Sequence, residues 1–569
     1  AGGAITHLLD SIHGRRDIQC VSMHHEQAAG FAAEGYARLN GRLGVAMATS
    51  GPGALNLLTP IGSCYFDSVP CLFLTGQVNT YEYKFDRPVR QIGFQETDIV
   101  SVATPLVKYA ELVKDPRRIR YCLEKAVFLA RHGRPGPVLL DLPMDVQRAK
   151  INPRALKTFF GSPEHRRLLK ASPTDFPALP KIVKALEKAN RPVILAGGGV
   201  RAAGAAEELA KLVKKTGIPV VASLMGLDAV SREEPAYSGM LGSYGNRFAN
   251  LTAANADLLL ILGSRLDSRQ TGTRPATFAR GAFKVHVDID PAELNAKLKA
   301  DIAVQGDLKL FLRKLNASLR SFRGADLKPW REAVNCYRRR YPALESRNPR
   351  GNISPNAFMD LLAGYTRPSD IICLDVGQNQ MWAGQSFRLK RGQRMLVSGG
   401  MGSMGFALPV AVGAALASGR RAVVITGDGG IQVNIQDLDS LPVRKLPVKI
   451  IMMNNGCLGM VRHFQDIYFG GRRQSTAVGY HCPDIGAIAA AYGVRGRKIR
   501  TMKEAAAVLE KVFSSDRAEL VDVKLGGDTT VDPKLLVNHP IEDLSPEISR
   551  EELAKEMFIK PIDAEPWID

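Results

Sequence analysis

The sequence predicts an α/β protein built from three successive doubly wound parallel-sheet domains. Strand-like apolar runs alternate with helix-like runs through most of the 569 residues. The alternation stops twice, near 148–176 and 322–353, in polar stretches that contain proline. Strands that alternate with helices form parallel sheets covered on both faces, and a chain of this length can bury several cores.

The first domain is expected at 1–150, followed by a linker at 151–176. Strand-like runs IQCVSM (18–23), LGVAMAT (43–49) and CLFLT (71–75) alternate with helix-like runs EQAAGFAAEGYARL (26–39) and ALNLLTPIGSCYFD (54–67). This order is βαβαβ, which is typical of a parallel sheet.

The second domain is expected at 177–321, with strands in RPVILAGGG, IPVVASL, ADLLLILG and FKVHVDID. A second linker (322–353) leads to the third domain (354–535), with strands in DIICLDVG, RRAVVITGDGG, PVKIIMMNN and AELVDVKL. The acidic tail (536–569) is expected to pack across the surface, with a short helix opened by the capping box SREE.

Composition excludes several classes of protein. The formal charge is +20, but lysine and arginine are scattered and form no long basic tract or zinc-finger spacing, so we expect no nucleic-acid partner. No apolar run is long enough for a membrane span, and no signal series opens the chain. The eight cysteines form no CxxC pair, which favours reduced thiols in a cytoplasmic protein.

Two polar motifs follow neighbouring strands of the third domain. Asp428 lies in the GDG that ends AVVIT, and Asn455 ends VKIIMMNN. Carboxyl ends of parallel strands form the ligand crevice of open α/β sheets. Either motif alone is more often a tight turn or a helix cap, but the pair, with hard oxygen ligands, suits Mg²⁺ bound to a diphosphate.

The ordered motifs HHEQAAGFAAEGYAR, ATSGPGALNLL, DSVPCLFLTGQV, GFQET, DVGQNQMW, SGGMGSMGFALPVAVGAA and GDGGIQVNIQDL extend over nearly the whole chain. They resemble the thiamine diphosphate enzymes, most closely the acetohydroxyacid (acetolactate) synthase branch. The resemblance implies pyrimidine-binding, FAD-binding and diphosphate-binding domains in that order. It also implies a homodimer or homotetramer with active sites between subunits.

The resemblance implies roles for particular residues. The carboxylate of Glu26 would activate the aminopyrimidine so that the thiazolium C2 proton is lost, whereas in an unrelated protein it would be a first-turn helix acid. Magnesium would be held by Asp428, Asn455 and the backbone carbonyl of Cys457. The other residues implied at thiamine diphosphate and its reacting carbon are Pro52, Asn56, Phe94, Gln95, Gln378, Asn379, Gly402, Met404, Gly429 and Met460.

In the middle domain, glycine turns and acidic positions at strand ends match the FAD site of the same branch, where the flavin is mostly structural. The residues concerned are Gly197, Gly198, Gly199, Leu241, Gly242, Gly263, Arg265, Asp267, Asp288, Ile289, Gly306 and Asp307. The domain could also have kept its fold and lost FAD.

Several positions depart from the synthase pattern. Phe464 stands where the branch has tryptophan, and Asn379 and Tyr244 stand where it has histidine, whereas Arg269 is retained and matches the arginine that meets the acceptor carboxylate in that branch. The loop 79–93 is longer than usual, and it carries Lys84, Arg87 and Arg90. These basic residues form either a solvated surface or a site for a nucleotide-linked acceptor.

We therefore expect a carboligase that decarboxylates pyruvate and transfers the two-carbon hydroxyethyl unit to a second carbonyl, giving acetolactate or a related acyloin. Transfer to the keto group of a nucleotide-linked deoxysugar, as in yersiniose biosynthesis, is the alternative. A flavin-dependent pyruvate oxidase and a catalytically silent binding protein of the same fold remain further alternatives.

Overall fold

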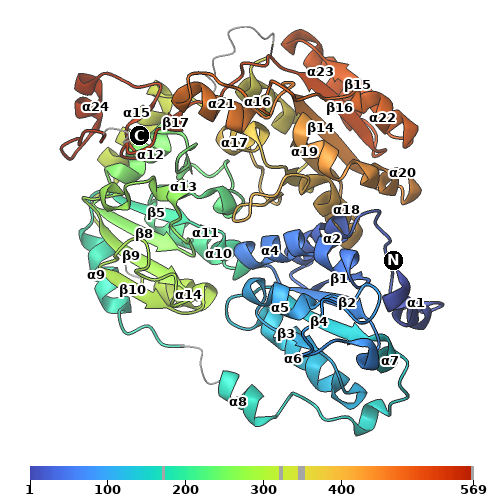
Figure 1. Ribbon diagram of the computed structural model, residues 1–569. Helices are drawn as coiled ribbons and strands as arrows, with labels where there is room; N and C mark the ends of the chain where they lie inside the picture. Colours follow the sequence, from blue (N-terminus) through green and yellow to red (C-terminus); the bar gives the residue numbers. More distant parts are fainter. Residues whose placement is uncertain (170–173, 320–323, 344–352, 566–569) are drawn as a thin grey trace.

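The computed structural model describes residues 1–169, 174–319, 324–343 and 353–565. Parts of both predicted linkers and the last four residues of the tail lie outside these ranges. Three parallel sheets, each covered by helices, follow one another along the chain (Figure 1), as predicted. None of the helices in the described ranges has the length and apolar character needed to cross a membrane.

The first sheet has the order β1-β2-β4-β3 and is parallel throughout. Its strands are β1 (Gly44–Ala48), β2 (Cys71–Gln77), β3 (Ala110–Leu112) and β4 (Val138–Pro143). The helices of this part are α1 (Thr6–Ile12), α2 (Glu26–Asn40), α3 (Pro52–Asn56), α4 (Leu58–Asp67), α5 (Ile99–Ala103), α6 (Ile119–Arg131) and α7 (Met144–Gln147). Helix α8 (Pro163–Leu169) lies in the first predicted linker.

The strand predicted at 18–23 is wrong. These residues form no strand, and Ile18 is exposed. The segment leads away from the first sheet toward the third domain, where the backbone N–H of His24 donates to Asp437 Oδ1 at 3.0 Å. An apolar run without a neighbouring strand cannot form ladder hydrogen bonds, so local β propensity is overridden by the route of the chain.

The second sheet has the order β10-β9-β8-β5-β6-β7. Its strands are β5 (Pro192–Ala196), β6 (Val220–Ala222), β7 (Tyr237–Met240), β8 (Leu258–Leu262), β9 (Phe283–Asp288) and β10 (Ile302–Gln305). The helices are α9 (Leu179–Lys188), α10 (Gly199–Ala202), α11 (Ala206–Thr216), α12 (Arg247–Ala254), α13 (Ser268–Thr271) and α14 (Leu308–Ser318). Helix α15 (Lys328–Arg340), inside the second predicted linker, packs on this domain through buried Trp330, whose indole N–H donates to Pro192 O at 3.1 Å.

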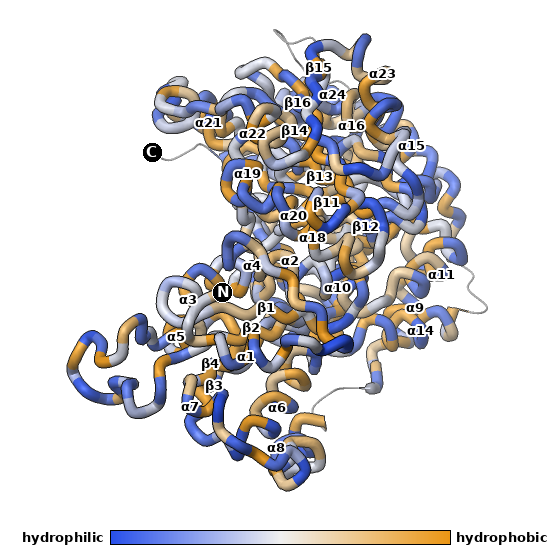
Figure 2. The backbone as a smooth tube through the Cα atoms, turned by 90° about the vertical axis from the view of Figure 1, so that its right-hand side faces the viewer, coloured by the Kyte–Doolittle hydropathy of each residue, from blue (hydrophilic) through white to orange (hydrophobic). Residues whose placement is uncertain are grey.

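The third sheet has the order β12-β11-β13-β14-β16-β15. Its strands are β11 (Ile371–Leu374), β12 (Arg394–Val397), β13 (Ala422–Gly427), β14 (Val448–Asn454), β15 (Arg495–Ile499) and β16 (Glu519–Lys524). The helices are α16 (Pro355–Tyr365), α17 (Gln378–Ser386), α18 (Ala407–Ser418), α19 (Asp428–Val433), α20 (Ser440–Val443), α21 (Gly459–Tyr468), α22 (Ile485–Ala491) and α23 (Met502–Phe513). Figure 2 shows hydrophobic residues concentrated along the central strands β13 and β14, as expected for strands buried on both faces.

The acidic tail packs back on the middle domain. Strands β17 (Lys534–Leu535) and β18 (Leu544–Ser545) form an antiparallel pair, and α24 (Arg550–Glu556) follows, close to α12 and α15 (Figure 1). Asn250 on α12 donates to Ile541 O at 2.8 Å. Half of the predicted capping box of α24 forms: Ser549 Oγ accepts from the backbone N–H of Glu552 at 3.1 Å, whereas Glu552 Oε1 accepts from the hydroxyl of Tyr341 at 2.6 Å.

A close helix contact joins the first domain to the third. Helix α2 packs on α18 with a glycine of each helix at the point of contact. A Cβ on Gly413 would lie 1.8 Å from the carbonyl oxygen of Ala32, and a Cβ on Gly35 would lie 2.3 Å from that of Val410. Because backbone atoms cannot move aside cheaply, only glycine permits this approach.

Replacing Gly413 with alanine should therefore destabilise the protein. We expect Gly413→Ala to lower the free energy of unfolding by about 1–3 kcal/mol, the usual cost of overpacking. Gly364→Ala is the matched control, because a Cβ on this glycine of α16 meets nothing within 4 Å. The control should be neutral or stabilising by up to about 1 kcal/mol. Urea unfolding of both variants measures the difference, and equal stabilities would contradict the α2–α18 analysis.

Candidate active site

Three oxygen atoms converge at the carboxyl ends of β13 and β14. The two strands pair in parallel, with Gly427 opposite Met453, so Asp428 and Asn455 leave the sheet side by side. The side-chain oxygen of Asn455 accepts a long hydrogen bond from the backbone N–H of Cys457 at 3.3 Å, but it also faces two acceptors, the carbonyl oxygen of Cys457 at 2.9 Å and Asp428 Oδ1 at 3.2 Å. Such an arrangement calls for a cation or for a reversed amide.

A chain of side-chain amides favours the orientation in which the oxygen of Asn455, and not its nitrogen, faces Asp428. Asn455 Nδ2 donates to Gln378 Oε1 at 2.8 Å, and Gln378 Nε2 donates to the carbonyl oxygen of Thr529 at 2.9 Å. Reversing Asn455 would let its amide donate to Cys457 O and Asp428, but would place its oxygen 2.8 Å from Gln378 Oε1, itself an acceptor. The network therefore aims the oxygen of Asn455 at Asp428.

The three oxygens fit Mg²⁺. At metal–oxygen distances of about 2.0–2.1 Å, adjacent ligands of an octahedron lie about 3 Å apart, which agrees with the 2.9 and 3.2 Å separations. Asp428 is 1 % exposed, and burial raises the pKa of its carboxyl group, although Tyr480 donates to Oδ2 at 2.8 Å. A bound cation would offset this desolvation. No cluster of three or more His, Cys, Asp or Glu suited to a metal occurs in the described ranges, and a cation at this point would be held by one carboxylate together with an amide and a backbone oxygen.

Other predicted residues surround the same strand ends. A Cβ on Gly429 would lie 3.2 Å from Met404 Cε, so Met404 covers the GDG turn. Gly402, nearby in sequence, has a left-handed backbone (φ +70°). Asn379 is buried and donates to the carbonyl oxygens of Asp375 (2.8 Å) and Ile425 (3.1 Å), so its amide joins the ends of β11 and β13. Met460 lies in the first turn of α21.

A second group of predicted residues gathers at the carboxyl end of β1. Glu26 opens α2, and Asn56 Nδ2 donates to Glu26 Oε2 at 3.0 Å. Pro52 begins α3, next to Gly51, whose Cβ position lies 3.0 Å from the carbonyl oxygen of Gln95. Gln95 has a positive φ of 63°, uncommon for a residue with a side chain, and the neighbouring Phe94 is 86 % exposed.

The two groups are not bonded to each other. In the part of the chain that the structure describes, no hydrogen bond or ion pair links Glu26, Asn56 or Gln95 to Asp428 or Asn455. A single chain thus carries the two halves of the predicted active site as separate clusters.

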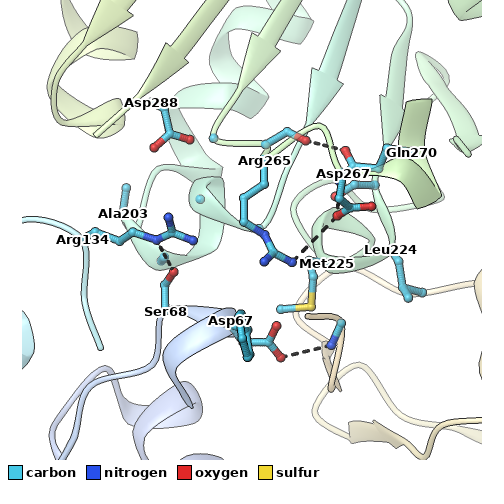
Figure 3. Close-up of a pocket in the computed structure, with 18 of the residues that line it drawn as sticks. Asp67, Ser68, Arg134, Ala203, Leu224, Met225, Arg265, Asp267, Gln270 and Asp288 are labelled. Atoms are coloured by element: carbon cyan, nitrogen blue, oxygen red, sulfur yellow. Dashed lines mark hydrogen bonds and ion pairs between the residues drawn. The ribbon is translucent and has the colours of Figure 1, made fainter. Parts of the chain in front are cut away.

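A cavity of about 320 Å³ lies at the carboxyl edge of the second sheet and reaches the first domain (Figure 3). Nine residues predicted for FAD line it: Gly198, Gly199, Leu241, Gly263, Arg265, Asp267, Asp288, Ile289 and Asp307. The other three, Gly197, Gly242 and Gly306, do not line it and instead allow close approaches of the chain, as where a Cβ on Gly197 would lie 2.1 Å from Gly263 O.

Arg134, a cavity-lining residue of the first domain, forms ion pairs with residues of the middle domain. Arg134 pairs with Asp290 (3.0 Å) and Glu293 (2.8 Å), and its Nε donates to Ser68 Oγ at 2.9 Å (Figure 3). Burial raises the pKa of Asp288 to about 6. Polar and apolar walls with a few placed charges suit an elongated cofactor that carries phosphates and ring systems.

The predicted acceptor residues Arg269 and Phe464 meet through two further side chains. The Arg269 guanidinium lies 5.6 Å from the centre of the Tyr244 ring. Lys534 Nζ lies 6.0 Å from the same ring and 5.4 Å from that of Phe464.

Sequence reasoning missed several residues of these sites. Thr529 follows β16, and Ser223–Met225 follow β6. Because ligands bind at the carboxyl ends of parallel strands, the argument that singled out Asp428 applies to these residues too. Asp67 and Ser68 were present in the DSVP motif without an assigned role. No sequence signal marks Tyr480, Arg134 or Lys534, because Tyr480 and Arg134 reach their sites from loops and Lys534 from the short strand β17.

Comparison with known proteins places these features in a family. Models of the thiamine pyrophosphate enzymes match in order: the N-terminal TPP-binding domain at 1–102, the central domain at 179–315 and the C-terminal TPP-binding domain at 375–523. Thiamine pyrophosphate is thiamine diphosphate. The acetolactate synthase large subunit of Lactococcus lactis subsp. lactis is 36 % identical over 94 % of this chain and 90 % of its own length. The acetolactate synthase isozyme 3 large subunit of Escherichia coli is 36 % identical over 94 % of this chain and 92 % of its own length. Chloroplastic acetolactate synthase 2 of Zea mays is 39 % identical over 88 % of this chain and 78 % of its own length.

The adjacent asparagines allow a matched test of the oxygen cluster. Asn455→Ala removes a converging oxygen and should weaken Mg²⁺-dependent binding of thiamine diphosphate about tenfold or more. Asn454→Ala is the control, because Asn454 donates to Asp522 at 3.0 Å and does not face the cluster. Calorimetric titration with the cofactor at several Mg²⁺ concentrations compares the two, and equal losses of affinity would count against the metal assignment.

Proposed function

The chain belongs to the thiamine diphosphate enzymes, on the branch of the acetolactate synthase large subunits, and we propose that it is a carboligase acting on pyruvate. It removes CO₂ from pyruvate and transfers the remaining two-carbon unit to the carbonyl carbon of a second 2-oxo acid, giving acetolactate when that acid is pyruvate. The observation that carries this proposal is the convergence of Asp428, Asn455 and the Cys457 carbonyl, all within the segment that matches the C-terminal TPP-binding domain of the family.

When bound, thiamine diphosphate supplies a thiazolium carbon that adds to the 2-oxo group and accepts the electrons left by CO₂. Asp428, Asn455 and Cys457 hold its magnesium and so neutralise the diphosphate. Glu26, at the opening of α2, holds a proton at the aminopyrimidine, and Asn56 keeps the carboxylate in place through its 3.0 Å hydrogen bond. Met404, above the GDG turn, limits the shape that the cofactor can take.

The active site is formed between two copies of the chain. Glu26 and the oxygen cluster belong to separate groups within one chain. Phe94, next to Gln95 with its positive φ, is exposed, and a second copy of the chain would bury it. A homodimer or homotetramer would unite the two groups.

FAD occupies the cavity of the middle domain. The glycine turns after β5 and β8 let the backbone approach a phosphate closely, and Asp288 ends β9 at the position where a ribose would be held. The first-domain residues Ser68 and Arg134 close the cavity, so the flavin would tie two domains together. Its role is structural, since the carboligation balances without a redox step.

Other reactions of the fold predict different products. A pyruvate oxidase would consume oxygen, whereas a silent binding protein would release no CO₂. Incubation with pyruvate, with CO₂, oxygen uptake and acyloin measured together, tests the proposal. Release of CO₂ with stoichiometric acetolactate and without oxygen uptake is the expected result, and oxygen-dependent acetate formation would overturn it.

Glu26→Gln preserves size and removes the carboxylate. The variant should still bind thiamine diphosphate, while exchange of the C2 proton, followed by NMR in D₂O, slows by about a hundredfold or more. Asn56→Ala, which only frees the carboxylate, should have a smaller effect. Exchange at the normal rate in Glu26→Gln would remove Glu26 from this role.

The flavin proposal predicts a yellow protein. Ala203 lines the cavity, so Ala203→Trp should fill part of it and lower the flavin absorbance per protein. Reducing the bound flavin of the unaltered protein should leave acetolactate formation nearly unchanged. A colourless, fully active preparation would refute the role of FAD.

A further inference from the structure

Lys534 is a buried cation without a polar partner. It lies in β17, is 5 % exposed, and among the described residues its Nζ has no hydrogen-bond partner. Three aromatic rings surround the ammonium group instead, with centres at 5.4 Å (Phe464), 5.6 Å (Tyr468) and 6.0 Å (Tyr244). Cation–π attraction offsets part of the desolvation but leaves all three N–H donors unused.

The surrounding charges do not neutralise Lys534. Asp532 accepts a hydrogen bond from Thr530 Oγ1 at 2.6 Å, and within the described ranges it forms no ion pair with the lysine. Burial lowers the pKa of Lys534 to about 8; the charge of Asp532 opposes this lowering, and Arg269 adds a smaller lowering. Burial and the field of Lys534 lower the pKa of His463 to about 4, so this ring is neutral at pH 7.

Lys534 stands beside the predicted acceptor site. The Tyr244 ring is shared between Lys534 and Arg269, and Tyr244 and Arg269 both line the middle-domain cavity. The described structure shows no hydrogen bond or ion pair from the Arg269 guanidinium. Five residues before Lys534, the carbonyl oxygen of Thr529 accepts from Gln378, which orients the magnesium ligand Asn455.

We propose that Lys534 and Arg269 together form an anion subsite for an acceptor that carries a second anionic group, a carboxylate or a phosphate, besides that of a 2-oxo acid. Arg269 meets the carboxylate next to the ketone, and Lys534 meets the second anion. The ring of Phe464, which is 36 % exposed, lies 5.4 Å from Lys534 Nζ and forms one wall of this subsite. This inference rests on the proposed carboligation.

Two cations without an ion-pair partner among the described residues favour an acceptor with two anionic groups over an acceptor with one. A monoanionic acceptor such as pyruvate satisfies Arg269 and leaves Lys534 unpaired, whereas a dianionic acceptor gives each cation a counter-ion in a desolvated site. In the coupling, pyruvate loses CO₂, a carbon–carbon bond forms to the ketone carbon of the acceptor, and the resulting alkoxide takes up one proton.

A competition between acceptors of equal chain length tests the subsite. Pyruvate is supplied as donor with equal concentrations of 2-oxoglutarate and 2-oxopentanoate, which differ in the second carboxylate, and the product ratio is read by mass spectrometry. In a parallel mixture, 3-phosphooxypyruvate replaces 2-oxoglutarate to distinguish phosphate from carboxylate. We expect the unaltered protein to favour a dianionic acceptor and Lys534→Met to reduce that preference about tenfold, whereas Lys534→Arg retains most of it.

Lys449→Met is the matched control. Lys449 is also buried and has its pKa lowered to about 8, but its Nζ donates to the carbonyl oxygen of Arg517, outside the acceptor region. The product ratio should be that of the unaltered protein, whatever the loss of stability, because a ratio does not depend on the folded fraction.

The outcomes separate this inference from the proposed function. An unchanged product ratio in Lys534→Met, or coupling to monoanionic acceptors alone by the unaltered protein, would overturn the subsite while leaving carboligation intact. If pyruvate releases no CO₂, the proposed function fails, and calorimetric titration with 2-oxoglutarate and 3-phosphooxypyruvate then decides the subsite. Weaker binding to Lys534→Met than to Lys449→Met supports it, and equal binding overturns it.

Discussion

The parallel pairing of β13 with β14 is the constraint on which the candidate active site depends. Because the two strands run in the same direction and in fixed register, their carboxyl ends deliver Asp428 and Asn455 to one point. The amide chain from Thr529 through Gln378 then fixes which atom of Asn455 faces Asp428. Hydrogen bonding thus converts a strand-end crevice into a set of oxygens with the spacing of a magnesium octahedron.

Burial of charge distinguishes ligand sites from structural networks when partners are considered. Burial raises the pKa of Asp141 to about 7, yet Thr75 and Gln77 both donate to its carboxylate, so this acid is satisfied within the first sheet. Asp428 and Lys534 are also desolvated, but Asp428 Oδ1 faces the oxygen of Asn455, although Tyr480 donates to Oδ2, and Lys534 Nζ has aromatic rings around it and no hydrogen-bond partner among the described residues. A buried polar atom that lacks a complementary partner, rather than burial itself, points to a ligand.

Much of the fold could be predicted because apolar runs of parallel strands are long and are bounded by glycine turns. Every strand expected in the second and third domains forms, whereas the run at 18–23 does not, since no neighbouring strand reaches it. Asp428 and Asn455 were predictable for the same reason that β13 and β14 were. Tyr480 was not, because it reaches Asp428 from a loop 52 residues further along the chain, with no motif to mark it.

By itself, the sequence determined the three parallel sheets and the family, and it supplied the residues that we propose at the cofactor positions, because periodicity, glycine turns and ordered motifs are local properties of the chain. Only the tertiary structure decided that α2 and α18 meet at Gly35 and Gly413, that the oxygen of Asn455 faces Asp428, and that β17 brings Lys534 to the Tyr244 ring, which Arg269 also faces. These contacts join residues far apart in the chain, and packing and hydrogen bonding in three dimensions set them, which no local pattern records.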